Sequence, residues 1–174
     1  MNVVCRWKSN VLMSIVLYAF SLGVCFAGNI WYVDPDRGDD TYDGKQLAVD
    51  AQAKKGPKKH LAWFVAANGL GNGDVIYAAK GHYAEDAVTT GGRQYRCVLN
   101  AANVRLISLA GAAETFIDGT MQSGVLQDAD PWGCGPDAVT PVFMTAGCVV
   151  QGFAIANGRI NDASGKYTVG GGVY

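Results

Sequence analysis

The sequence predicts an all-β fold of the solenoid type, in which short strands stack in successive coils along one axis. Apolar runs of three to six residues recur through the chain, with Gly, Asn, Asp or Ala between them. The 23 glycines of the 174-residue chain fall beside these runs, which indicates many tight turns. No helical periodicity is visible after residue 70. With 49% hydrophobic residues, the chain is long and apolar enough to bury one core.

The first 27 residues have the pattern of a secretory signal peptide. Arg6 and Lys8 give a positive start, and residues 11–27 are almost wholly apolar. Cys25 and Ala27 are small residues at the two positions that a signal peptidase reads, so cleavage is expected after Ala27. An uncleaved membrane anchor is one alternative, because a 17-residue apolar run is at the lower limit of a span, and lipidation of Cys25 is another. We therefore expect an extracytoplasmic mature chain, secreted or at the cell surface or outer membrane, without a membrane span.

Charge and cysteine content narrow the possible partners and covalent links. Without residues 1–27 the chain has 12 basic and 15 acidic residues, a net charge of −3, which argues against a nucleic-acid partner. Three cysteines remain in that part, Cys97, Cys134 and Cys148. An oxidising compartment would allow one pair to form a disulfide. The sequence leaves the pairing and the oligomeric state open.

Residues 28–72 are expected to form the N-terminal end of the solenoid. Residues 28–33 are predicted as a strand, 34–44 as an acidic turn and 45–60 as a polar loop. Residues 61–67 follow a Pro and end at Asn68-Gly69, which predicts a short helix. Its dense apolar residues indicate a buried lid that covers the open end of the core.

Residues 73–174 are expected to form the first coils. Coils of about 20–25 residues with three strands each are typical of a β-solenoid. On that spacing, residues 104–127 form one coil, and 142–156 with 172–174 form most of the next. Tyr174 falls inside a strand-like segment, which favours the front piece of a longer solenoid. The predicted strands are 75–79, 95–99, 104–109, 115–117, 124–127, 142–145, 148–151, 153–156 and 172–174.

A β-sandwich is the competing architecture, because it also has many short strands. Its strands would alternate apolar and polar residues and would be joined by hairpins. Here apolar residues often stand side by side, as in Val75-Ile76 and Leu106-Ile107. Residues 128–137 lack a strand signal and are predicted to form a loop that projects from the solenoid.

Several segments resemble secreted bacterial right-handed parallel β-helix proteins of the pectate-lyase-like superfamily. The strand at 32–34, the Asp- and Gly-rich turn at 39–44, the helix at 61–67, Gly73-Asp74-Val75-Ile76 and Gly81-His82-Tyr83 follow the order of such an N-terminal cap. Residues 150–158 and 170–174 resemble rungs of the polymorphic outer-membrane-protein type. The resemblance implies a right-handed parallel β-helix with a short N-terminal capping helix. It implies no particular activity, because that superfamily includes lyases, hydrolases and non-catalytic surface proteins.

The acidic turn is a candidate Ca²⁺ site. Five carboxylates within ten residues could supply oxygen ligands to a hard cation. Their spacing does not fit an EF-hand, and local bonds from Asp side chains to backbone N–H groups are the alternative. The carboxylates belong to Asp34, Asp36, Asp39, Asp40 and Asp43.

Two residues are candidates for contact with a polysaccharide or cell-surface glycan. Arg105 alternates with apolar neighbours and would point outward from a strand, and Trp132 on the predicted loop could stack on a sugar ring. Solvation of Arg105 and packing of Trp132 are the alternatives. Lys80, Arg93, Arg96 and Arg159 are further candidate bases, but the sequence has no recognisable catalytic motif. His60 and His82 are interpreted as surface residues.

Three functions remain open at this point. The first is a secreted or cell-surface, non-catalytic, adhesin-like or structural module. The second is the N-terminal part of a polysaccharide lyase or glycoside hydrolase, and the third is a carbohydrate-binding module.

Overall fold

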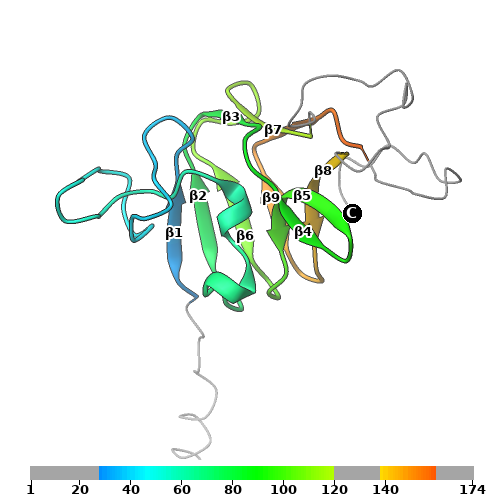
Figure 1. The fold of residues 1–174 in the computed structure, drawn as a ribbon, viewed down its shortest axis with the longest axis horizontal. Coiled ribbons are helices and arrows are strands. Elements are labelled where there is room, and N and C mark those ends of the chain that lie inside the picture. The colour runs from blue at the N-terminus through cyan, green and yellow to red at the C-terminus, as the bar shows by residue number, and fades with distance from the viewer. Residues whose placement is uncertain (1–27, 120–137, 160–174) are drawn as a thin grey trace, which may run out of the picture.

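A computed structural model describes residues 28–119 and 138–159, which are mostly β-strands (Figure 1). The signal peptide predicted at 1–27, the strands predicted at 124–127 and 172–174, and Trp132, Cys134 and Tyr174 lie outside these ranges. The strands are β1 (Ile30–Val33), β2 (Val75–Ala78), β3 (Gly81–Tyr83), β4 (Val88–Thr90), β5 (Arg93–Leu99), β6 (Arg105–Ser108), β7 (Thr115–Asp118), β8 (Val139–Met144), β9 (Val149–Gln151) and β10 (Ala154–Ala156).

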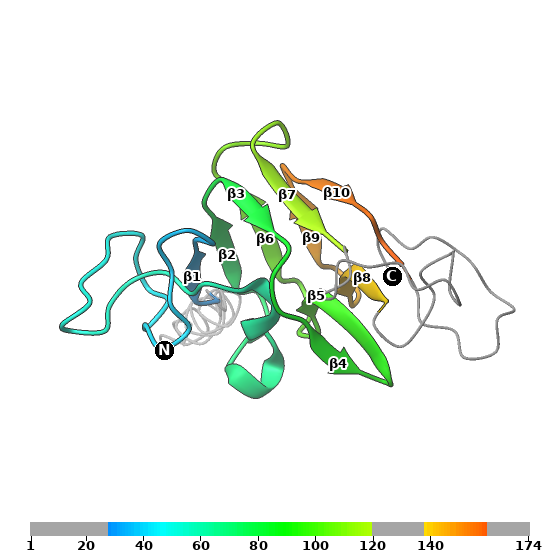
Figure 2. The ribbon, with the colours of Figure 1, turned by 45° about the horizontal axis from the view of Figure 1, so that its top comes forward.

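The strands form three sheets whose members come from distant parts of the chain. The β1 sheet has the order β1-β2-β6-β9, the β3 sheet β3-β7-β10, and the β5 sheet β4-β5-β8. The strands of the β1 sheet lie side by side in Figure 1, and those of the β3 sheet are clearest in Figure 2. Every pair in these sheets is parallel except β4 with β5. The all-β prediction is therefore confirmed, and the parallel pairing excludes a sandwich built from hairpins for the described residues.

The chain visits the three sheets in a fixed order. It passes through β2, β3 and β5, then β6, β7 and β8, and then β9 and β10. Partners in adjacent passes are farther apart than the predicted 20–25 residues: Val75 pairs with Arg105, 30 positions later, and Arg105 pairs with Val149, 44 positions later. The predicted assignment of residues 142–145 to the following coil is also wrong, because β8 pairs with β5 and closes the pass that β6 begins.

One side of each strand supplies the core. In the β1 sheet the inward positions Val33, Ala78 and Ile76 are fully buried, and Leu106 lies in register with Ile76. Their neighbours along each strand face outward and are partly or wholly exposed. Stacking of identical inward positions produces a continuous aliphatic column, so each strand covers the next and the backbone hydrogen bonds are satisfied between passes.

The hairpin of β4 and β5 was not predicted. Val88 pairs with Tyr95 and Thr90 with Arg93 in an antiparallel register around Gly91-Gly92. Both glycines have positive φ, at 59° and 78°, the left-handed conformation that a tight hairpin turn requires. The Gly-Gly pair was the available signal, but the short polar strand Val88–Thr90 resembles a loop. The hairpin lengthens the first pass beyond the predicted coil.

The predicted capping helix at 61–67 is not an α-helix. The segment forms two single 3₁₀ turns, η1 (Leu61–Trp63) and η2 (Ala66–Asn68), separated by extended backbone at Val65 (φ −129°, ψ 158°). Aromatic and β-branched residues at 63–65 lose side-chain freedom in a helix, which disfavours continuous α-helix. The predicted burial is confirmed at Leu61 and Phe64, which are 2% and 0% exposed and belong to the core.

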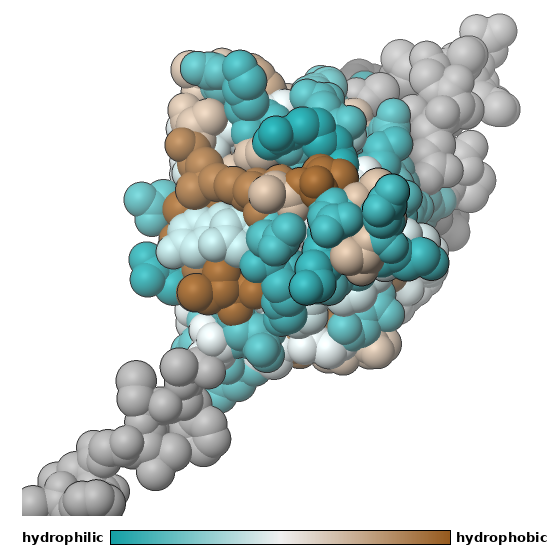
Figure 3. Space-filling view, turned by 90° about the vertical axis from the view of Figure 1, so that its left-hand side faces the viewer, coloured by the Kyte–Doolittle hydropathy of each residue, from teal (hydrophilic) through white to brown (hydrophobic). Residues whose placement is uncertain are grey.

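The 34–58 loop covers the outer edge of β1. Tyr32 N donates to Gly44 O at 2.8 Å, Lys58 N donates to Tyr32 O at 2.9 Å, and Asp34 N donates to Lys58 O at 2.9 Å. These bonds satisfy backbone groups that an edge strand would otherwise leave open to another chain. Seen from this end, much of the surface is hydrophilic, with hydrophobic residues gathered in a band and in a separate group below it (Figure 3).

Candidate functional site

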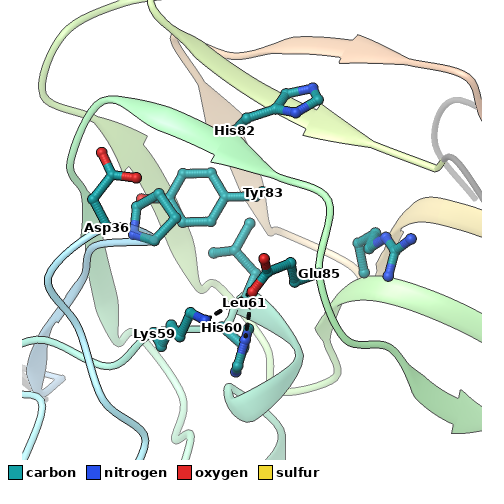
Figure 4. A pocket seen from close by; sticks show the side chains of 9 residues that line it. Asp36, Lys59, His60, Leu61, His82, Tyr83 and Glu85 are labelled. Atoms are coloured by element: carbon teal, nitrogen blue, oxygen red, sulfur yellow. Dashed lines mark ion pairs between the residues drawn. The ribbon is translucent and has the colours of Figure 1, made fainter. Parts of the chain in front are cut away.

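A pocket opens where the loop after β1, the start of η1 and the β3 strand meet (Figure 4). Most of the side chains that line the pocket are charged groups or imidazoles. Pro35, Leu61 and Tyr83 form its apolar wall. The polar lining residues are Asp36, Lys59, His60, His82, Glu85 and Arg96. They come from four segments that are distant in the sequence, so the fold brings them together.

His60 is held in one orientation by Asp40. Asp40 Oδ1 accepts hydrogen bonds from the backbone N–H groups of Lys59 and His60, at 2.8 and 3.1 Å. Its Oδ2 lies 2.7 Å from His60 Nδ1. A carboxylate only accepts hydrogen bonds, so Nδ1 carries the proton and donates. The other ring nitrogen, Nε2, is thereby left for the pocket side.

Two further carboxylates face the same imidazole. Glu85 Oε2 lies 3.6 Å from His60 Nε2 and is paired with Lys59 Nζ at 2.8 Å, as the dashed lines in Figure 4 show. Asp86 Oδ2 lies 3.9 Å from Nδ1. The hydrogen bond between Lys59 and the exposed Glu85, together with their opposite charges, lowers the pKa of Glu85 and raises the pKa of Lys59. His60 therefore lies within a ring of acidic oxygens.

Arg96 fixes the inner wall of the pocket. Its side chain is only 1% exposed, and its Nε donates to Asp118 O at 2.9 Å while Nη1 donates to the carbonyl of Asp86. Burial lowers the pKa of this guanidinium. Asp118 in turn accepts from Asn157 and pairs with His82 Nε2 at 3.0 Å. His82 is thus directed toward Asp118, away from the His60 group.

The five carboxylates of the acidic turn are not gathered into one site. Asp34 is buried and binds Arg37 and the N–H groups of residues 36 and 37, while Asp39 and Asp43 accept from the N–H groups of Thr41 and Lys45. Asp36 is exposed on the pocket rim. In the described ranges one group of three metal-ligating side chains converges, Asp40, His60 and Asp86. Of the predicted Ca²⁺ ligands, it includes Asp40 alone.

Arg105 is exposed on the outer face of the β1 sheet, in the orientation predicted for it. Arg105 lies in register with Val75 and Val149. In the same sheet the rings of Tyr32 and Tyr77 form a tilted pair, with 5.8 Å between their centroids. Trp132 and Cys134 lie outside the described residues. Cys97 and Cys148 are both free thiols, and burial raises the pKa of Cys97 to about 12.

Two residues of the cap motifs have structural roles that the sequence did not reveal. Asp74 is 1% exposed and accepts from Asn29 N, Trp31 Nε1 and Gly71 N at 2.6 to 2.9 Å. Tyr83 donates its hydroxyl to backbone carbonyls of Val33 and Ala79, and its burial raises its pKa. Both join the first strand to later ones across more than forty residues.

No protein-family model, curated protein or solved structure matches the chain. Within the described ranges, no helix has both the length and the apolar character that crossing a membrane demands.

Proposed function

We propose that the chain is a secreted or cell-surface right-handed parallel β-helix module with an adhesin-like or structural, non-catalytic role. The observation that carries this proposal is the repeated register of the β1 sheet, in which Ile30, Val75, Arg105 and Val149 occupy equivalent positions in successive passes. Return of the chain to the same three sheets in the same order supports a solenoid, because each coil of a solenoid repeats the path of the coil before it.

This architecture suits a surface role for a physical reason. Each coil is buried only by its neighbours, so a solenoid grows along its axis and presents long outer faces built from alternate residues of each strand. The predicted signal peptide at 1–27 supports export. Exposed Ile30, Arg105 and Val149, at equivalent register positions of the β1 sheet, supply such an outer face here.

Export is tested by expressing the full chain in a Gram-negative host and sequencing the N-terminus of the protein from each fraction. Cleavage after Ala27 predicts an extracytoplasmic product that begins at Gly28. A product that retains Met1 and stays in the cytoplasmic fraction would contradict the proposal. Surface attachment is then tested by protease treatment of intact cells.

A polysaccharide-degrading enzyme is the second candidate, favoured by the Asp40-oriented His60 in the pocket. A carboxylate that fixes the tautomer of an imidazole leaves Nε2 available as a proton acceptor. The assay measures release of unsaturated uronate from polygalacturonate, with and without Ca²⁺. Turnover by the wild type that is lost in His60→Gln would contradict the non-catalytic role and assign His60 to the active site. Turnover unaffected by that substitution would place any active site elsewhere.

A carbohydrate-binding module is the third candidate, favoured by the outer face of the β1 sheet. The neighbouring rings of Tyr32 and Tyr77 offer an apolar surface to a sugar ring, and the Arg105 guanidinium offers donors to carboxylates or hydroxyls. A glycan array compares the wild-type chain with Arg105→Ala and Trp132→Ala. Loss of binding in either variant supports this role, and an unchanged profile in both counts against it.

A further inference from the structure

We propose that Asp40, His60 and Asp86 form a binding site for a divalent transition-metal ion of the Zn²⁺ type. The ligand atoms are Asp40 Oδ2, His60 Nδ1 and Asp86 Oδ2, which all lie within 4.8 Å of one another. They come from the loop after β1, the residue before η1, and the loop between β3 and β4. This inference is independent of the proposed surface role.

The two carboxylates are prepared for single-oxygen coordination. Asp40 Oδ1 is occupied by the N–H groups of Lys59 and His60, and Asp86 Oδ1 by the N–H of Ala87 at 2.8 Å. In both residues Oδ2 is the oxygen that faces His60 Nδ1, at 2.7 and 3.9 Å. Donor atoms around a tetrahedral Zn²⁺ are separated by about 3.3 Å, given metal–ligand distances of about 2.0–2.1 Å. The two carboxylate oxygens, at 2.7 and 3.9 Å from His60 Nδ1, lie on either side of that spacing.

The surroundings of the imidazole fit a ligating histidine. A metal on Nδ1 takes the place of the proton now shared with Asp40, so the neutral ring carries its proton on Nε2. That nitrogen faces Glu85 Oε2 at 3.6 Å, and Glu85 is held by Lys59 at 2.8 Å. A carboxylate on the second ring nitrogen is the usual outer-sphere partner of a metal-bound histidine. Figure 4 shows Lys59, Glu85 and His60 on one side of the pocket.

The donor set selects the class of ion. One imidazole nitrogen with two carboxylate oxygens suits Zn²⁺ or a similar transition metal, whereas Ca²⁺ takes six to eight oxygens. Asp86 has a side chain 54% exposed, so solvent or a ligand can reach the remaining coordination position. Three protein ligands with one open position resemble reactive or exchangeable zinc sites more than closed structural ones.

Isothermal titration of the tag-free full chain with ZnCl₂, MnCl₂ and CaCl₂ tests the proposal. We expect one Zn²⁺ per chain, bound at least tenfold more tightly than Ca²⁺. His60→Gln and Asp86→Asn should each weaken Zn²⁺ binding at least tenfold. The matched controls are His82→Gln, the other histidine of the pocket, and Asp39→Asn, a neighbouring carboxylate outside the group; both should bind as the wild type does.

A second measurement distinguishes direct ligation from a general surface effect. Co²⁺ in the site should give the intense visible absorption of a tetrahedral complex, and His60→Gln should lose it. If His60→Gln fails to fold by circular dichroism, Asp86→Asn at an exposed position serves instead. Equal affinity for Zn²⁺ and Ca²⁺, no Zn²⁺ binding by the wild type, or wild-type binding in both ligand variants would each overturn the proposal.

Discussion

The N-terminal segment, residues 28–72, and the stacked strands, residues 75–119 and 138–156, are held together by different kinds of interaction. The stacked strands rely on parallel backbone ladders and on a column of aliphatic side chains such as Ile76 and Leu106. The N-terminal segment joins that ladder through β1 and otherwise relies on particular side chains that contact distant residues. Trp31 bonds to Asp74, and Lys58 lies over the ring of Trp63, 3.8 Å from its centroid, while donating to Asp40 O.

The difference shows how a stack of strands is ended without an α-helical lid. An aliphatic column continues only if another strand follows, so its first strand needs a cover of a different, non-repeating structure. Here a loop, two 3₁₀ turns and an aromatic cluster of Trp31, Trp63 and Phe64 supply it. The same segments carry Asp40 and His60, so the candidate site lies in the part of the chain that covers the first strand.

The largest expected effect is in the aliphatic column. Leu106→Ala removes a fully buried side chain and should lower the free energy of unfolding by about 3 kcal/mol. Ile107→Ala, one position along the same strand and facing outward, should cost less than about 1 kcal/mol. Chemical denaturation of the two variants measures the contrast. Equal losses would mean that the two faces of β6 are not inside and outside.

Asp74→Asn tests the polar contacts of the N-terminal segment. The amide places N–H donors against the N–H groups that Asp74 now accepts from, so we expect a loss of about 2–3 kcal/mol. Asp36→Asn is the control, because Asp36 is exposed and should change stability by less than about 0.5 kcal/mol. A neutral result at Asp74 would show that its three bonds do not hold Trp31 in place.

Alkaline pH should weaken the fold through Cys97. Its thiol has an ordinary pKa of 9.0, raised to about 12 by burial. The native state therefore keeps a proton that the unfolded chain has lost, and stability present below pH 9 declines as pH rises toward 12. Between pH 7 and pH 10 the decline from this group is roughly 1–1.5 kcal/mol. Thermal melts of wild type and Cys97→Ala measure it; an equal decline in both would rule out Cys97 as the cause.

Tyr83→Phe should give the smallest of these effects. It removes hydrogen bonds to the carbonyls of Val33 and Ala79 but keeps the buried ring, so we expect a loss of about 1 kcal/mol at neutral pH. Tyr95→Phe in β5 is the matched control, a buried tyrosine for which we expect a smaller loss. A larger loss at Tyr95 would contradict the role given to Tyr83 as a link between the first strand and β3.

The sequence predicted the repeating part of the fold better than the part that carries the candidate site. Short apolar runs at 75–79, 104–109 and 115–117 are local patterns, and strands lie there. The antiparallel hairpin depends on a polar strand without such a pattern. The pairing of Asp40 with His60, and of both with Asp86, depends on loops that meet only in the folded chain. The sequence identified Asp40 as one carboxylate of an acidic turn and His60 as a surface residue. No local sequence pattern linked the two residues.

The fold described above depends on β2, β6 and β9 stacking in parallel and in register. Cross-strand nuclear Overhauser contacts in an isotopically labelled chain measure this pairing. We expect inter-strand Hα-to-amide contacts that place Ile76 beside Leu106 and Leu106 beside Val150, at the spacing of a parallel ladder. Close Hα-to-Hα contacts between neighbouring strands, the signature of antiparallel pairing, would contradict it.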